Sequence, residues 1–315
     1  DDGCFIIDGS EDWGLFCKYV EDTDNGVNAK LTADITEAVT EMAGTSGKPY
    51  TGTFDGGGHT LTVNYETRSE DCTAPFRYTK GATIENLTVE GLITTSKKFA
   101  GGVIAYNADG SSVQTVLRCC VSNVTIVSEV RGDGTHGGLV GVNNNDDMVI
   151  EHCAFTGALI KRVDVMTDCC GGLVGWSNGT AVVRNCLLSA TFAVSSTGSN
   201  TFVRNNATVS NCYYVNALGD VPEGATQIES ETLSSGEALR LLGSAWAQKI
   251  GTHGDKCPTP YLESRKATAN YVYNDGTGWV CENYLLGDKE TVEIGLDFTA
   301  KSLTYGRTFT LDDGY

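Results

Sequence analysis

The stretch VLRCCVS, residues 116–122, recurs after 33 residues as VIEHCAF (149–155) and after the same step again as VVRNCLL (182–188). An earlier copy, TIENLTV (83–89), carries leucine in place of the cysteine, and a later copy, TVSNCYY (208–214), follows after 26 residues. Each copy is a short run of β-forming residues without helical periodicity. A unit of short strands cannot bury its apolar side alone, so we expect it to stack on copies of itself.

A parallel β-helix meets this requirement, because equivalent residues of successive coils then lie one strand spacing, about 4.8 Å, apart. A β-propeller has blades of similar length. It also needs four strands per blade and aromatic or Trp-Asp signatures, which these repeats lack. We therefore predict an all-β fold, a right-handed parallel β-helix.

Three rows of equivalent residues are expected in this β-helix. One row points into the core as small apolar filler and contains Leu87, Cys120, Cys153, Cys186 and Cys212. A second row lies at a bend, where asparagine tolerates the left-handed conformation, and contains Asn86, Cys119, His152, Asn185 and Asn211. The third row is a corner of paired glycines at Gly101-Gly102, Gly137-Gly138 and Gly171-Gly172.

Four regions are expected along the chain. Residues 1–73 form an N-terminal cap and the first coil, and residues 74–216 carry the β-helix repeats. Residues 217–260 form a C-terminal cap, and residues 261–315 form a linker and the beginning of a further β-rich domain.

Both caps are expected to contain a helix. The first helix has Ser10 as its N-cap and places Trp13 and Phe16 on one apolar face. The second helix begins with a capping box formed by Ser234 and Glu237. A solenoid needs such caps, because its end coils otherwise expose apolar side chains and unpaired backbone groups.

The composition argues against several classes of partner. The formal charge is −18, and only 22 of 315 residues are Lys or Arg, so nucleic acid and anionic lipid are not expected ligands. No stretch reaches the roughly 20 apolar residues of a membrane-spanning helix, so direct membrane insertion is not expected. The cysteines lack zinc-binding spacing, and we expect no metal and no cofactor.

The second repeat series, GGVIAYN (101–107), GGLVGVNN (137–144) and GGLVGWSN (171–178), resembles the GLUG motif of large secreted and surface β-helical proteins of bacteria, especially gut bacteria. KLTADI (30–35) and other stretches extend the resemblance over about residues 5–260. The resemblance implies a right-handed β-helix that is exported to the cell surface as one module of a longer multidomain chain with an adhesive role. It implies no catalytic residues, because the motif is structural.

Carboxylates are the candidates for catalysis if the protein is an enzyme. Glu129, Asp133, Asp164 and Asp168 are expected on adjacent coils. A glycoside hydrolase needs two carboxyl groups about 5 to 9 Å apart, which one or two coil spacings provide. A polysaccharide lyase is less favoured, because its site generally needs clustered Lys or Arg with a cation.

The same coils also offer candidate ligand-binding residues. Arg131 and Asp133 belong to an Arg-Gly-Asp tripeptide and are expected to stack on Arg162 and Asp164 of the next coil. The structural interpretation of these pairs is a weak surface salt-bridge ladder. Trp176 is expected either to stack on a sugar ring or to pack against the neighbouring coil.

These features leave three functional hypotheses. The first is an extracellular, non-enzymatic β-helix module that binds a glycan or a host surface protein, with Tyr106 as a further aromatic candidate. The alternative is a polysaccharide-active enzyme with carboxylates on one face. The last is a passive structural stalk.

Overall fold

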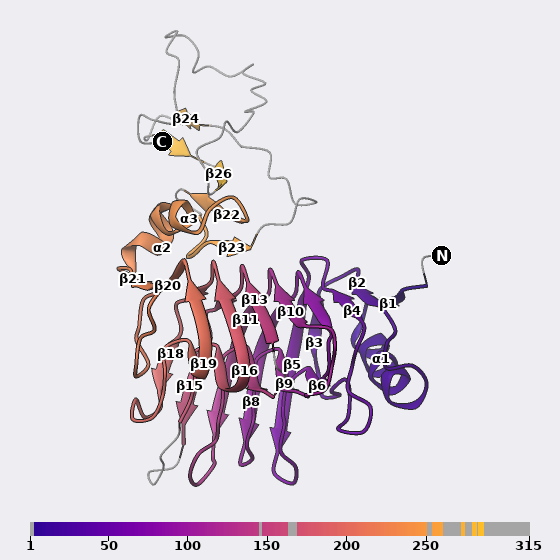
Figure 1. Ribbon diagram of the computed structural model, residues 1–315. Coiled ribbons are helices and arrows are strands. Elements are labelled where there is room, and N and C mark those ends of the chain that lie inside the picture. The colour runs from indigo at the N-terminus through magenta and orange to yellow at the C-terminus, as the bar shows by residue number, and fades with distance from the viewer. Residues whose placement is uncertain are drawn as a thin grey trace. The chain divides into compact units, whose positions relative to one another are not determined.

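The computed structural model describes residues 3–144, 147–162, 169–250, 254–260, 272–274, 279–281 and 283–286. It confirms the predicted fold class: residues 1–228 form a compact unit in which short parallel strands stack coil upon coil (Figure 1). An 11-stranded sheet supplies two faces of this β-helix, and a 10-stranded sheet supplies the third. The register is regular, since Thr88–Thr95 pairs residue by residue with Val121–Ser128 of the next coil.

The central coils contribute strands to all three faces. The first face contains β6 (Phe76–Thr79), β9 (Ile104–Asn107), β12 (Val140–Asn143) and the first parts of β16 (Val174–Arg184) and β19 (Val203–Ser210). The second face contains β1 (Phe5–Ile7), β2 (Ala29–Leu31), β4 (Thr53–Asp55), β7 (Thr83–Glu85), β10 (Thr115–Arg118), β13 (Asp147–Glu151) and the remainders of β16 and β19. The third face contains β3 (Ile35–Val39), β5 (Thr60–Thr67), β8 (Thr88–Thr95), β11 (Val121–Ser128), β14 (Ala154–Phe155), β15 (Ala158–Lys161), β17 (Leu187–Leu188), β18 (Thr191–Ala193), β20 (Cys212–Tyr214) and β21 (Ala225–Gln227).

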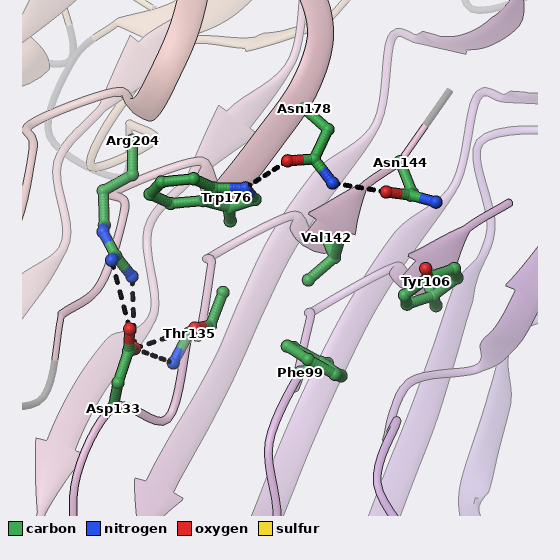
Figure 2. Close-up of a pocket in the computed structure, with 9 residues that line it drawn as sticks. All are labelled: Phe99, Tyr106, Asp133, Thr135, Val142, Asn144, Trp176, Asn178 and Arg204. Atoms are coloured by element: carbon green, nitrogen blue, oxygen red, sulfur yellow. Dashed lines mark hydrogen bonds and ion pairs between the residues drawn. The ribbon is translucent and has the colours of Figure 1, made fainter. Parts of the chain in front are cut away.

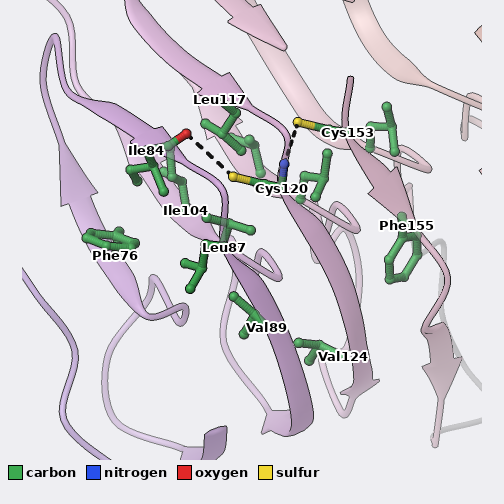
Figure 3. Packing of buried hydrophobic residues seen from close by; sticks show 14 of the residues in the cluster. Phe76, Ile84, Leu87, Val89, Ile104, Leu117, Cys120, Val124, Cys153 and Phe155 are labelled. Atoms are coloured by element: carbon green, nitrogen blue, oxygen red, sulfur yellow. Dashed lines mark hydrogen bonds between the residues drawn. The ribbon is translucent and has the colours of Figure 1, made fainter. Parts of the chain in front are cut away.

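The predicted inward row and the predicted bend are both confirmed. All five inward residues are at most 1% exposed, and the five bend residues all have φ between 48° and 59°. Figure 3 shows how the cysteines join neighbouring coils: the backbone N–H of Cys120 donates to Sγ of Cys153 at 3.4 Å, and Sγ of Cys120 donates to the carbonyl of Ile84 at 3.4 Å. The left-handed bend turns the chain from the second face to the third.

The glycine corner is also confirmed, and close approach of backbone explains it. Gly101, Gly137 and Gly171 pair in parallel on successive coils. A Cβ at Gly137 would lie 2.0 Å from the carbonyl oxygen of Val140, inside any allowed contact. A side chain cannot be accommodated there without moving the backbone of the coil.

The N-terminal helix α1 (Ser10–Asp22) closes one end of the core. Trp13 and Phe16 are fully buried, and Trp13 meets Phe76 edge to face with ring centroids 5.8 Å apart. The expected N-cap was wrong by one residue: Gly9 is the N-cap, and Oγ of Ser10 donates to Glu37 Oε2 at 2.6 Å instead.

Residues 229–315 form a second compact unit, described here by itself. Its elements are α2 (Glu231–Ser235), α3 (Glu237–Leu242), β22 (Trp246–Ile250), β23 (Thr259–Pro260), β24 (Val272–Asn274), β25 (Trp279–Cys281) and β26 (Asn283–Leu286). The predicted capping box is wrong, because Ser234 lies inside α2 and Gly236, at φ 87°, separates the two helices. Within the described part of the chain, no helix has the length and apolarity needed to cross a membrane.

Candidate functional site

An open pocket of about 390 Å³ lies on the first face of the β-helix. Figure 2 shows its lining, which combines aromatic rings, amides and one pair of opposite charges. The lining residues are Phe99, Tyr106, Asp133, Thr135, Val142, Asn144, Trp176, Asn178 and Arg204.

The repeat itself explains how these side chains come together. Tyr106, Val142 and Trp176 occupy the same position of the second repeat, and the strand register places them side by side on β9, β12 and β16. Their side chains all line the pocket, with Tyr106 and Trp176 partly exposed and Val142 buried between them. The pocket is therefore built from equivalent positions of the repeat, where the residue type changes from coil to coil.

A second row of the lining comes from the loop before each glycine corner. Phe99 and Thr135 both lie two residues before a paired glycine and both have positive φ, 65° and 51°. A Cβ at Gly141 would lie 2.8 Å from the backbone carbon of Phe99, and one at Gly175 would lie 2.7 Å from the carbonyl oxygen of Thr135. The glycines therefore let each loop lie close against the next coil. Left-handed backbone at non-glycine residues is uncommon and tends to occur at functional sites.

Trp176 is held in place from two sides. The guanidinium of Arg204 lies 4.9 Å from the centre of its ring, within cation–π range. Its indole N–H donates to Oδ1 of Asn178 at 2.7 Å, and Nδ2 of Asn178 donates to Oδ1 of Asn144. These contacts fix the ring orientation while leaving part of the ring exposed.

Asp133 is the carboxylate of the pocket. Both of its oxygens accept from Arg204 at 3.2 Å, and Oδ1 also accepts from the backbone N–H and the hydroxyl of Thr135 at 2.9 and 2.8 Å. Partial burial would raise the pKa of Asp133, but the hydrogen bonds from Arg204 and Thr135 outweigh it and hold the pKa below its usual value. Asp133 is therefore ionised at neutral pH, and the charges of Asp133 and Arg204 offset each other.

His136 supports the loop that carries Asp133 and Thr135. It is buried, its Nδ1 accepts from the backbone N–H of Ala100 at 3.1 Å, and its Nε2 lies 2.9 Å from Oγ of Ser128. Because Nδ1 is an acceptor, the proton of the neutral ring sits on Nε2 and is donated to Ser128. Burial lowers the pKa of His136 to about 4, against a smaller opposing effect of Asp133.

Ser128 and His136 are not arranged as a catalytic nucleophile and its general base. A base would need an unprotonated Nε2 facing the hydroxyl, whereas here Nε2 is the donor. Both side chains are only 1% exposed, so a substrate has no access to them. The contact is structural.

The residues predicted as a site from the sequence separate into different places. Asp133 and Trp176 line the pocket together with Tyr106. Glu129 and Arg162 do not line it; they form an ion pair of 2.9 Å with each other. Arg131 is exposed and is likewise outside the lining. Asp164 and Asp168 lie outside the described residues.

The expected stacking of Arg131 on Arg162 was therefore wrong in register. Parallel pairing aligns Ser128 with Lys161, which places Glu129 beside Arg162. Glu129 also accepts from Arg68 at 2.5 Å, and the hydrogen bonds from Arg68 and then Arg162 lower the pKa of its carboxyl. This cluster is a surface ion-pair network.

Sequence reasoning missed part of the lining, most importantly Arg204 and the amides of Asn144 and Asn178. A signal for the amides existed, because Asn144 and Asn178 end the second repeat at the same position. Arg204 had a weaker signal, since its coil reads TFVRNN (201–206) and lacks the paired glycines.

Comparisons with known proteins add information on the fold only. No protein-family model matches the chain, and no curated protein sequence matches it. The chain is similar to the crystal structure of a Bacteroides ovatus protein with the provisional name immunoglobulin A1 protease, with a TM-score of 0.53 and 16% sequence identity. The match covers 81% of this chain and 91% of that chain. At this identity, the likeness concerns the fold and carries nothing about activity.

Proposed function

We propose that this chain is a non-catalytic carbohydrate-binding module and that the pocket around Trp176 and Tyr106 holds the glycan. The carrying observation is the combination of two partly exposed aromatic rings with amide groups on one rigid sheet face. Sugar rings present apolar C–H faces and polar hydroxyl edges. Aromatic side chains match the faces, and amides and carboxylates match the hydroxyls.

The polar groups of the pocket are positioned before any ligand arrives. Asn178 is fixed by Trp176 and Asn144, and Asp133 is fixed by Arg204 and Thr135. Fixed polar groups lose little conformational entropy on binding, which favours affinity. Asn144 also lines the pocket, and its Oδ1 accepts from Asn178.

Hydrolysis of the glycan is less well supported than binding. A glycosidase needs a pair of carboxyl groups, one of them protonated as general acid. Among the described lining residues, Asp133 is the only carboxyl group, and its lowered pKa keeps it ionised. Proteolysis, suggested by the name of the structural neighbour, has no support from Ser128 and His136, which are buried with the proton on the wrong nitrogen.

The setting that we propose for this module is the bacterial cell surface. The resemblance to GLUG-motif proteins supports it, and an adhesive role is consistent with a pocket on a stacked β-helix. On this proposal the chain is one part of a longer surface protein that attaches to host or dietary glycan. A passive stalk remains the alternative if no glycan binds.

A glycan array with the purified protein tests the proposal, followed by product analysis of each hit. We expect binding without released oligosaccharides. The variant Trp176→Ala should lose the signal, whereas Tyr19→Ala, an exposed aromatic of α1 at 37% exposure, should keep it. A blank array overturns the glycan proposal in favour of a stalk, and released products overturn it in favour of an enzyme.

A further inference from the structure

The aromatic surface continues beyond the pocket along the β-helix axis. Tyr78 on β6 pairs in register with Tyr106 on β9, and their ring centroids are 5.7 Å apart. Phe99 adds an edge contact to Tyr106 at 6.0 Å. From Tyr78 to Trp176, the row crosses three strand spacings, about 14 Å in total.

A polar row runs parallel to this aromatic row. Asn144 and Asn178 lie two residues beyond Val142 and Trp176 on their coils, so they point to the same side of the sheet. Asn206 continues the row, since its Nδ2 donates to the carbonyl of Asn178 at 2.9 Å. An extended ligand along the axis would meet rings beneath it and amides along its edge.

The two arginines that contact the aromatic row each pair with an acid. At one end Arg204 pairs with Asp133, and at the other Arg77 stacks over Tyr78 at 5.7 Å and pairs with Glu70. The charge of each cation that contacts the aromatic row is therefore offset by an acid, which favours a neutral sugar over an anionic one.

We propose that the site binds a neutral, extended oligosaccharide of at least four sugars along the β-helix axis, with its far end on Tyr78. This inference rests on the proposed glycan-binding function. One strand spacing, about 4.8 Å, is close to the length that one sugar adds to an extended chain. Tyr78 and Tyr106 lie one spacing apart, and Trp176 lies two spacings beyond Tyr106, with Val142 between them. The three rings therefore match the first, second and fourth units of such a chain.

Isothermal titration calorimetry with oligosaccharides of two lengths tests this inference. The probes are the hexasaccharides and disaccharides of cellulose, xylan and mannan, with hexagalacturonate as the anionic comparison. The variant Tyr78→Leu removes the aromatic face but keeps apolar volume, and Tyr78→Phe keeps the ring. Tyr213→Ala on the third face is the matched control.

We expect at least one neutral hexasaccharide to bind, with affinity about tenfold weaker for Tyr78→Leu and unchanged for Tyr78→Phe and Tyr213→Ala. Disaccharide binding should not change in any of these variants. If Tyr78→Leu binds the hexasaccharide like the wild type while Trp176→Ala does not, the extended site is wrong and the proposed function stands. Equal affinity for hexagalacturonate, or no binding by any hexasaccharide, also overturns the inference. A blank glycan array overturns both proposals.

Discussion

The guanidinium of Arg204 lies 3.2 Å from each carboxylate oxygen of Asp133, a residue 71 positions earlier in the chain. Arg204 is only 8% exposed and also donates to the carbonyl of Cys169 at 2.7 Å. It therefore ties three coils together at the edge of the pocket. Loss of its partner leaves a largely buried cation.

Substitution of Asp133 is expected to destabilise the β-helix. Asp133→Asn should lower the free energy of unfolding by about 1–2 kcal/mol, less than for a fully buried pair because Asp133 retains 38% exposure. Urea unfolding measures this change. Arg162→Ala removes an exposed pair and is the control, with an expected change of about 0–1 kcal/mol. Equal changes in the free energy of unfolding for the two substitutions would show that the Asp133–Arg204 pair stabilises the fold no more than an exposed ion pair.

Acid is expected to destabilise the fold through His136. Unfolded histidine takes up a proton below its usual pKa of 6.5, but buried His136 does so only near pH 4. The unfolded state thus binds more protons between these values, and stability falls as the pH drops from 6.5 to 4, by about 3 kcal/mol in all. Below pH 3.8, protonation of Asp133 adds a further loss, because its pKa is also lowered.

The matched variants for this pH dependence are His136→Gln and His152→Asn. Burial also lowers the pKa of His152, so this residue contributes to the same pH dependence of stability. Asparagine occupies the same bend in other coils, so His152→Asn removes the contribution of His152 without disturbing the bend. Urea unfolding from pH 4 to 7 should show a flatter profile for His136→Gln than for His152→Asn. An unchanged slope in His136→Gln would contradict the assignment.

The inward cysteines are expected to resist alkylation in the folded protein. Cys120, Cys153, Cys186 and Cys212 are all 0% exposed, and burial raises the pKa of Cys153 and Cys186. Iodoacetamide followed by mass spectrometry should label them only in urea. Ser196→Cys, at an exposed position, is the positive control. Labelling of the inward row without denaturant would mean that the coils open.

A methyl group at the glycine corner is expected to prevent stable folding. Gly137→Ala brings a Cβ to 2.0 Å from the carbonyl of Val140, so the coil has to shift, at a cost above about 3 kcal/mol. Gly47→Ala has open space and no positive φ, and should change stability by less than about 1 kcal/mol. Circular dichroism and urea unfolding compare the two. A folded, equally stable Gly137→Ala would refute the close-approach explanation.

Features that recur on every coil could be predicted from the sequence. The inward cysteines, the bend at Asn86 and its equivalents, and the paired glycines each recur because neighbouring coils impose the same environment on the same position. The constant step of 33 residues also predicts that Glu129, and not Arg131, lies beside Arg162. The like residue types of Arg131 and Arg162 suggest another alignment, but the strand register follows the step.

The pocket could be predicted only in part, because its lining residues differ from coil to coil, whereas the core residues recur. Trp176, Tyr106 and Asp133 stood out by residue type, but their proximity depends on loops of unequal length before each glycine corner. Arg204 lies in a coil with a shorter step: Asn205 pairs with Ser177, 28 residues earlier. Such local shortening changes the alignment of every later residue, so a fixed step of 33 residues no longer predicts which residues are in contact.

The glycine corners and the inward cysteines have a consequence for how this protein can change over evolutionary time. None of them lines the pocket, and three of the residues that do line it, Tyr106, Val142 and Trp176, occupy equivalent positions of successive coils. Exchange of residues 106 and 176, which are only partly buried, leaves the inward cysteines and the glycine corners in place. Selection can therefore alter ligand preference one coil at a time, with the same inherited scaffold beneath.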